Sequence, residues 1–253
     1  MIKEEDIVFV TTTLYTKWLD YQQRIIKEYF PKSSIILIDG RPEHFTWPNS
    51  WFYWIEETKK SNCKYFIHID EDFFITDKNE LLKVIEKMES DNLDLVGCPD
   101  GYHEYRGANP VAINTFLMFG RIDDLRKINL NNIQFAYTQQ GWMNNYNLKY
   151  KSSYKNDFTY KFEISGGSNL EFEQEPYYAF LWAMKEIGCK FDYLYPFFDN
   201  TYKSTNPRLY EKSPDIGVHM WYTRQWDGDM DVHGVPNFER YNKIEEYLNE
   251  ESK

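Results

Sequence analysis

Residues 65–74 read Tyr-Phe-Ile-His-Ile-Asp-Glu-Asp-Phe-Phe, an apolar run that leads directly into three acids. In an extended chain Asp70 and Asp72 point to one side and Glu71 to the other, because side chains alternate along a strand. The triplet is also compatible with a solvated turn or a helix-capping cluster. Because the apolar run resumes at Phe73, however, the acids lie between segments expected to be buried, where carboxylates require a partner. The segment therefore predicts a strand that ends in a two-carboxylate cation site.

Strand and helix patterns alternate on both sides of this segment. β-branched and aromatic runs predict strands at 7–11, 34–38 and 93–97. Apolar residues at helical spacing predict helices at 18–30, from about Ser50, and after an Asp77–Glu80 capping box. This alternation predicts a doubly wound half-domain with parallel strands, in which ligands bind at the carboxyl ends of the strands.

The chain after Pro99 is less regular. Residues 101–114 predict a long loop, 116–119 a strand, and 129–169 irregular loops and short strands around an acceptor site. A helix is predicted at 176–187, ended by Gly188, followed by a strand at 191–195. The acidic tail from Glu239 predicts a surface helix. No internal repeat or low-complexity linker divides the chain, so a single domain is expected.

Composition narrows the classes of partner. The net charge of -11 opposes the phosphate-neutralising surface that nucleic-acid binding requires. Three dispersed cysteines without a CxxC pair predict reduced, structural thiols. The sequence has no signal-peptide pattern and no apolar run long enough to span a membrane, so we expect a soluble, cytoplasmic protein. Aromatic residues make up 19% of the chain, which suits a carbohydrate acceptor, although core packing also explains many of them.

The strand that runs into Asp-x-Asp makes the chain resemble the GT-A glycosyltransferases. The resemblance implies an α/β fold of GT-A type, with a Rossmann-like, mostly parallel central sheet flanked by helices and an irregular acceptor-binding part. It implies one domain, with a nucleotide-sugar-binding part at 1–120, an acceptor-binding part at 121–235 and a C-terminal helix at 236–253. It also implies that Asp72 binds Mn²⁺ or Mg²⁺, and that Asp70, at the same metal site, contacts the ribose or a metal-bound water.

Two further segments resemble the nucleotide-binding part of such enzymes. Thr11, Thr12 and Thr13 end the first predicted strand, where the resemblance implies contacts with the nucleoside. Asp39 ends the second predicted strand, where an acid often reads the base or ribose. The Asp39-Gly40 pair is equally compatible with a plain turn.

Two later segments resemble the catalytic part. Glu173 and Glu175 precede the helix predicted at 176–187, and the resemblance makes them candidates for the general base, although acids are ordinarily favoured at helix N-termini. His219 resembles a late histidine that is a further metal ligand, with Arg224 near the diphosphate. A single histidine in an aromatic segment is otherwise more often a packed core residue, and His68 is expected to be one.

These features together predict a metal-dependent glycosyltransferase that moves a sugar from a nucleotide-diphosphate donor, most simply a UDP-sugar, to a carbohydrate or other hydroxyl acceptor. A second interpretation is a nucleotidyltransferase. It is less favoured, because the turn after the first strand has the sequence Thr-Thr-Thr-Leu-Tyr and lacks a Gly- and Lys-rich phosphate loop. A non-catalytic carbohydrate-binding module, built on the aromatic residues, is a third. The sequence leaves the sugar, the acceptor and the stereochemistry open.

Overall fold

The computed structural model describes residues 2–15, 17–41, 49–100, 112–129, 177–199 and 204–220, with isolated residues 242 and 246. Within these residues a central six-stranded sheet has the order β2-β1-β3-β6-β5-β7. Its strands, in chain order, are β1 (Ile7–Thr13), β2 (Ser34–Asp39), β3 (Tyr65–Ile69), β5 (Leu95–Pro99), β6 (Ile113–Arg121) and β7 (Phe191–Tyr193).

The central sheet is mostly parallel, as the sequence predicts. β1 pairs in parallel with β2 and with β3, and β5 pairs in parallel with β7. β6 is the exception, because it lies antiparallel between β3 and β5. The strand predicted at 93–97 is therefore present but is not a neighbour of β3, since the later strand β6 is inserted between them.

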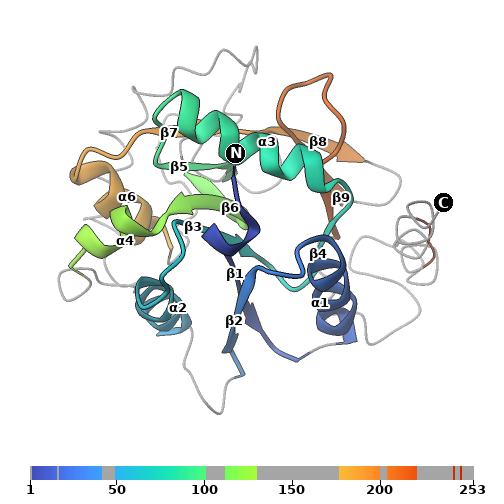
Figure 1. Cartoon of the computed structure of the whole chain (residues 1–253), viewed down its shortest axis with the longest axis horizontal. Helices are drawn as coiled ribbons and strands as arrows, with labels where there is room; N and C mark the ends of the chain where they lie inside the picture. The colour runs from blue at the N-terminus through green and yellow to red at the C-terminus, as the bar shows by residue number, and fades with distance from the viewer. Residues whose placement is uncertain are drawn as a thin grey trace, which may run out of the picture.

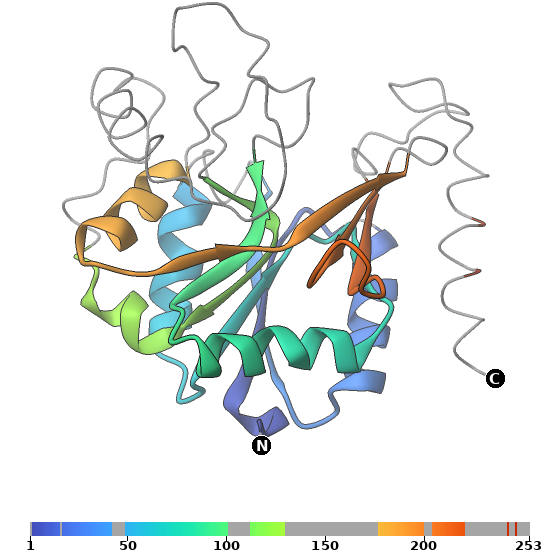
Figure 2. The same cartoon turned by 90° about the horizontal axis from the view of Figure 1, so that it is seen from above.

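Helices cover both faces of this sheet. Helices α1 (Lys17–Tyr29) and α3 (Lys78–Ser90) lie on one side, and α2 (Asn49–Lys59), α4 (Ile122–Lys127) and α6 (Tyr178–Glu186) lie on the other (Figures 1 and 2). A short 3-10 helix, η1 (Glu4–Asp6), precedes β1. The structure confirms the capping residue predicted for α3, because the Asp77 carboxylate accepts hydrogen bonds from the backbone N–H groups of Asn79 and Glu80.

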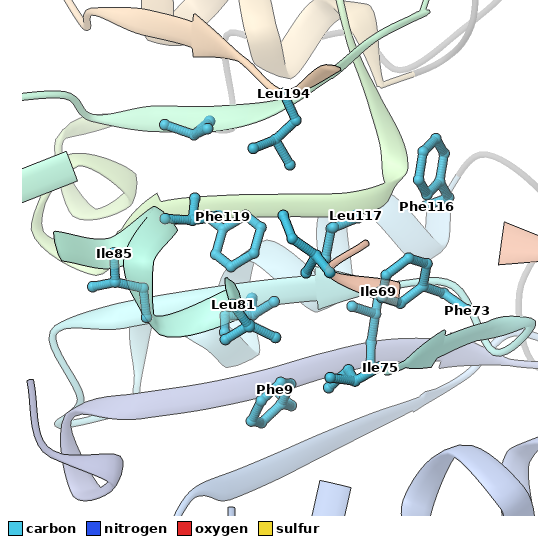
Figure 3. Close-up of a cluster of buried hydrophobic side chains, with 14 of the residues drawn as sticks. Phe9, Ile69, Phe73, Ile75, Leu81, Ile85, Phe116, Leu117, Phe119 and Leu194 are labelled. Atoms are coloured by element: carbon cyan, nitrogen blue, oxygen red, sulfur yellow. The ribbon is translucent and has the colours of Figure 1, made fainter. Parts of the chain in front are cut away.

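The two faces contain separate apolar clusters. Side chains from α1, α3 and the facing sides of β1, β3 and β6 form the first, which includes Phe9, Ile69, Leu81 and Phe119 (Figure 3). The second lies under α2, α4 and α6 and includes Trp54. Alternate residues of β1 supply the two clusters, Phe9 the first and Val10 the second, as expected of a strand buried on both faces.

A second, four-stranded antiparallel sheet has the order β4-β10-β9-β8. It consists of β4 (Phe73–Ile75), β8 (Tyr195–Asp199), β9 (Ser204–Arg208) and β10 (Gly217–Met220). Sequence analysis missed this sheet, because its strands are short and their partners are distant in sequence. The single strand predicted at 191–195 is divided at Leu194 between β7 of the central sheet and β8 of the second sheet.

Helix α6 ends where the sequence predicts. Gly188 follows the last turn of α6 with a φ of 89°, in the left-handed region that favours glycine, so its predicted role as the helix stop is confirmed.

The irregular segment predicted at 129–169 lies almost entirely outside the described residues, and the three-part division of the chain stays a prediction. Across the described segments, no helix combines the length and apolarity needed to cross a membrane.

Candidate metal centre

The candidate site begins at the turn between the two sheets. β3 ends at Ile69, and the chain turns through Asp70 and Asp72 before β4 begins at Phe73. The backbone N–H of Phe73 donates to the carbonyl of Asp70 at 3.0 Å, which closes a four-residue turn. Because β3 is parallel to β1 and β2, this turn lies at the carboxyl edge of those strands, where ligands of open α/β sheets bind.

Strand β10 brings His219 to this turn. β10 pairs antiparallel with β4 so that His219 lies opposite Phe73, and the Met220 N–H donates to the Asp72 carbonyl at 3.0 Å. Gly217 allows this close approach, because a Cβ there would lie 2.4 Å from a ring carbon of Phe73. The His219 ring is also stacked on Phe116, with centroids 4.4 Å apart and planes 4° from parallel. The pairing of β10 with β4 and one ring contact thus position the imidazole.

Asp70, Asp72 and His219 converge. One ligand atom from each residue lies within 4.8 Å of the others, and His219 Nε2 is 3.2 Å from Asp72 Oδ1. The side chains of Asp72 and His219 are only 2% and 4% exposed, whereas Asp70 is half-buried. Two carboxylates and one imidazole are ligands that Mn²⁺ accepts readily. This donor set therefore fits a divalent cation with an open side at Asp70.

His68 lies two residues before Asp70 and has the core role that the sequence predicts. Its Nδ1 lies 2.8 Å from the carbonyl of Thr115, to which the ring donates, and the side chain is buried. Burial lowers the pKa of His68, with Asp70 and the Thr115 bond opposing that shift. The ring is therefore neutral near pH 7.

The threonines at the end of β1 are joined to the turn by two residues that sequence analysis did not select. Thr11 Oγ1 donates to Gln22 Oε1 at 3.1 Å, and Thr13 Oγ1 donates to Glu71 Oε2 at 2.5 Å. Thr11 and Thr13 are buried, and Thr12 is half-buried. Contact between these threonines and a nucleoside stays a prediction. Gln22 carries a readable signal, since it is a polar residue on the apolar face of its helix.

Asp39 lies at the end of β2, next to β1, and is paired with Arg41. The Arg41 guanidinium donates to both carboxylate oxygens, from Nε at 2.9 Å and from Nη2 at 2.6 Å, as a bidentate pair. The same guanidinium lies 4.7 Å from the ring centroid of Tyr15, whose side chain is exposed. Asp39 therefore makes the turn contact that the sequence allows, and its contact with a base or ribose stays a prediction.

The remaining predicted site residues lie outside the described residues. Glu173 and Glu175 precede α6, which begins at Tyr178, and Arg224 follows β10, which ends at Met220. Their roles as base candidates and as a diphosphate contact stay predictions.

A second cluster of possible ligands lies elsewhere in the fold. Single ligand atoms of Asp94, Asp124 and Cys189 also lie within 4.8 Å of one another. The Asp124 carboxylate accepts a hydrogen bond from Lys127 Nζ at 2.5 Å, and Asp94 accepts one from the Lys190 N–H at 2.8 Å. Burial, with help from both aspartates, raises the pKa of the Cys189 thiol to about 12. This cluster already has partners and a protonated thiol.

Comparisons with known proteins give distant structural matches, among them two solved structures. No protein-family model and no curated protein matches the chain. A solved glycosyltransferase involved in the glycosylation of the major capsid of PBCV-1 is 14% identical, with 74% of this chain and 81% of that chain covered and a TM-score of 0.43. A197 from STIV is 10% identical, with 51% and 71% covered and a TM-score of 0.37. Both TM-scores fall below 0.5, and neither match identifies a family for this chain.

Proposed function

We propose that this protein is a divalent-cation-dependent glycosyltransferase that uses a nucleotide-diphosphate-sugar, most simply a UDP-sugar, as its donor. One observation supports this most directly. Asp70, Asp72 and His219 bring ligand atoms within 4.8 Å of one another at the carboxyl edge of parallel strands. A divalent ion held by few protein ligands and completed by substrate phosphates is a usual way to bind a nucleotide diphosphate.

Different residues of the chain would bind the cation and the nucleoside. Buried Asp72 and His219, with half-buried Asp70, would hold the cation, and Asp70 would also contact the ribose or a water. A divalent cation bound there would supply positive charge to offset the charge that develops on the leaving diphosphate. Thr12 and Asp39, at the ends of neighbouring strands, would contact the nucleoside, together with Thr11 and Thr13.

Proton transfer would be carried out by the segment before α6. The acceptor hydroxyl forms the new bond to the anomeric carbon of the sugar, while the nucleoside diphosphate leaves. In an inverting reaction Glu173 or Glu175 would take the hydroxyl proton, and Arg224 would bind the departing diphosphate. The acceptor is a carbohydrate or another hydroxyl compound.

Calorimetric titration tests the proposal. A panel of nucleotide-sugars is titrated into the protein with Mn²⁺, with Mg²⁺ and with EDTA. We expect at least one nucleotide-sugar to bind only when a divalent cation is present, with Asp72→Ala abolishing that binding while the circular dichroism spectrum is unchanged. Binding that is equal in EDTA, or full turnover by Asp72→Ala, would remove the metal role.

The same panel separates this activity from the alternatives. A nucleotidyltransferase would prefer a nucleoside triphosphate with a sugar phosphate and release pyrophosphate. A carbohydrate-binding module would bind glycans equally with and without cation or nucleotide. Transfer of a sugar with release of a nucleoside diphosphate is expected only from the proposed activity.

A further inference from the structure

Gln22 is a buried polar residue that contacts the turn carrying both aspartates. It lies on α1, its side chain is 1% exposed, and its neighbours on the same helix face include Trp18 and Ile25, which belong to the apolar cluster. Its Nε2 donates to the carbonyl of Asp70 at 2.5 Å and lies 3.3 Å from the carbonyl of Phe73, which it also bonds. The amide therefore joins the first and last residues of the turn.

The orientation of this amide is determined by its partners. Two carbonyl oxygens require the two N–H bonds of the amide nitrogen, so the amide oxygen must face the other way. That oxygen accepts from Thr11 Oγ1 at 3.1 Å and from Gln23 Nε2 at 3.5 Å. A side chain with only donors or only acceptors could not make this set of bonds.

Other contacts hold the backbone of the turn on either side of the two aspartates. The Asp70 N–H donates to the Phe116 carbonyl at 3.1 Å, and the Asp72 carbonyl accepts from Met220 N–H. The buried Glu71 carboxylate accepts from Thr13 Oγ1 and from the Leu14 N–H at 3.1 Å. Cation ligands bind well when such outer contacts fix their geometry before the ion arrives.

We propose that Gln22 is a positioning residue for the cation site, and that its amide holds the turn so that the carboxylates of Asp70 and Asp72 converge before a cation binds. This inference rests on the proposed function. Gln22 itself does not touch the cation. Its amide is buried at a cost that only good hydrogen bonds offset, and those bonds lead to the turn, to the end of β1 and to the adjacent glutamine.

The test compares two substitutions of neighbouring residues on α1. Gln22→Met keeps the length of the side chain and removes its hydrogen bonds, whereas Gln23→Met makes the same change in a residue whose hydrogen bond, among the described residues, goes only to Gln22 Oε1. Binding of Mn²⁺ alone is measured by calorimetry and by electron paramagnetic resonance of the free ion. We expect Gln22→Met to weaken Mn²⁺ binding about tenfold or more, and Gln23→Met to change it less than about threefold.

A loss of affinity must be separated from a loss of fold. Circular dichroism and the thermal midpoint without Mn²⁺ report folding for each variant, and the affected protein should still saturate at high Mn²⁺. If Gln22→Met does not fold, Thr11→Val replaces it, because this nearly isosteric change removes the bond that orients the amide oxygen. We expect Thr11→Val to weaken Mn²⁺ binding about threefold or more.

The outcomes distinguish the positioning role from the proposed function. If the wild-type protein binds Mn²⁺, Asp72→Asn does not, and Gln22→Met binds as tightly as Gln23→Met, the positioning role is wrong and the cation site stands. If Gln22→Met does not fold, the Mn²⁺ affinity of Thr11→Val is compared with that of Gln23→Met in the same way. If the wild-type protein binds no Mn²⁺, both proposals fail together.

Discussion

Two clusters in this fold satisfy the same simple criterion of proximity but differ in their surroundings. Asp70, Asp72 and His219 lie at the carboxyl edge of the parallel strands, while Asp94, Asp124 and Cys189 lie away from it; each trio brings its ligand atoms within 4.8 Å. In the second cluster Lys127 already neutralises Asp124.

The first cluster has different surroundings. Within the described part of the chain, neither lysine nor arginine forms an ion pair with Asp70, and Asp72 has the imidazole of His219 at 3.2 Å. Backbone hydrogen bonds and the Gln22 amide hold the turn that contains Asp70 and Asp72. Proximity of ligand atoms is therefore insufficient to define a metal site, because prior neutralisation of the ligands decides whether a cation has a role.

Matched substitutions of one aspartate from each cluster give the largest expected difference. We expect Asp72→Asn to weaken Mn²⁺ binding by more than about a thousandfold, since changing a mere outer contact of a metal ligand already costs 10–100-fold. Asp124→Asn should leave Mn²⁺ affinity unchanged. Calorimetry on both variants checks this, and equal losses would show that the comparison between the clusters is wrong.

Alkylation of Cys189 tests the second cluster directly. With its pKa raised to about 12 from an ordinary value of 9.0, the thiol holds almost no thiolate at pH 8. We expect iodoacetamide to modify Cys189 about a hundredfold more slowly in the folded protein than in urea, because the thiolate is the nucleophile. Peptide mapping by mass spectrometry gives the rates. Rapid modification in the folded state at pH 8 would mean that a thiolate is available there.

Replacement of the imidazole should alter which cation is preferred. In His219→Asn we expect Mn²⁺ affinity to fall about tenfold while Mg²⁺ affinity changes less than about threefold, because Mg²⁺ prefers oxygen ligands and gains little from a nitrogen ligand. Competition titrations with both cations measure the ratio. Equal losses for the two cations would indicate that His219 supports the turn through its contact with Phe116 and does not bind the ion.

The smallest expected effect concerns Lys185 of α6, which interacts electrostatically with Cys189. Burial lowers the pKa of Lys185 from 10.5 to about 8. Between these values the unfolded chain binds the proton and the folded chain does not, so stability rises with pH in this window. We expect Lys185→Met to stabilise the protein at pH 7 by only about 1 kcal/mol, because partial exposure screens the cost of the charge.

Urea unfolding at pH 7 and pH 10.5 measures this difference. The gain from Lys185→Met should shrink to near zero at the higher pH, where the unfolded lysine also loses much of its charge. Other titrating groups are common to both proteins and cancel in the comparison. A gain that is the same at both pH values would show that the effect is one of packing only.

Local sequence was sufficient to predict two of the three residues of the candidate site. Asp70 and Asp72 follow a buried strand whose pattern is complete within a few residues, and the structure shows that strand at Tyr65–Ile69. Their approach to His219 depends instead on the pairing of β4 with β10, two strands too short to be recognised from their own residues. His219 was predicted from the resemblance to GT-A enzymes and not from a pattern of spacing.

The strand order and the supports of the turn lay beyond sequence reasoning for a related reason. The place of β6 between β3 and β5 depends on how the later chain returns to the sheet. Gln22 and Glu71 are single polar residues, and the carbonyls and hydroxyls that they bind come from other segments of the chain. A polar residue on an apolar helix face could have indicated a buried contact, but not its partner.

The pairing of β10 with β4 also sets the stage of synthesis at which this centre is complete. A nascent chain that has left the ribosome as far as β6 contains both aspartates and Gln22, but not Met220, whose N–H donates to the Asp72 carbonyl. The imidazole of His219 is added only when β10 has been made and has docked along β4. The three-ligand arrangement therefore forms only after β10 has been synthesised, and shorter translation products lack it.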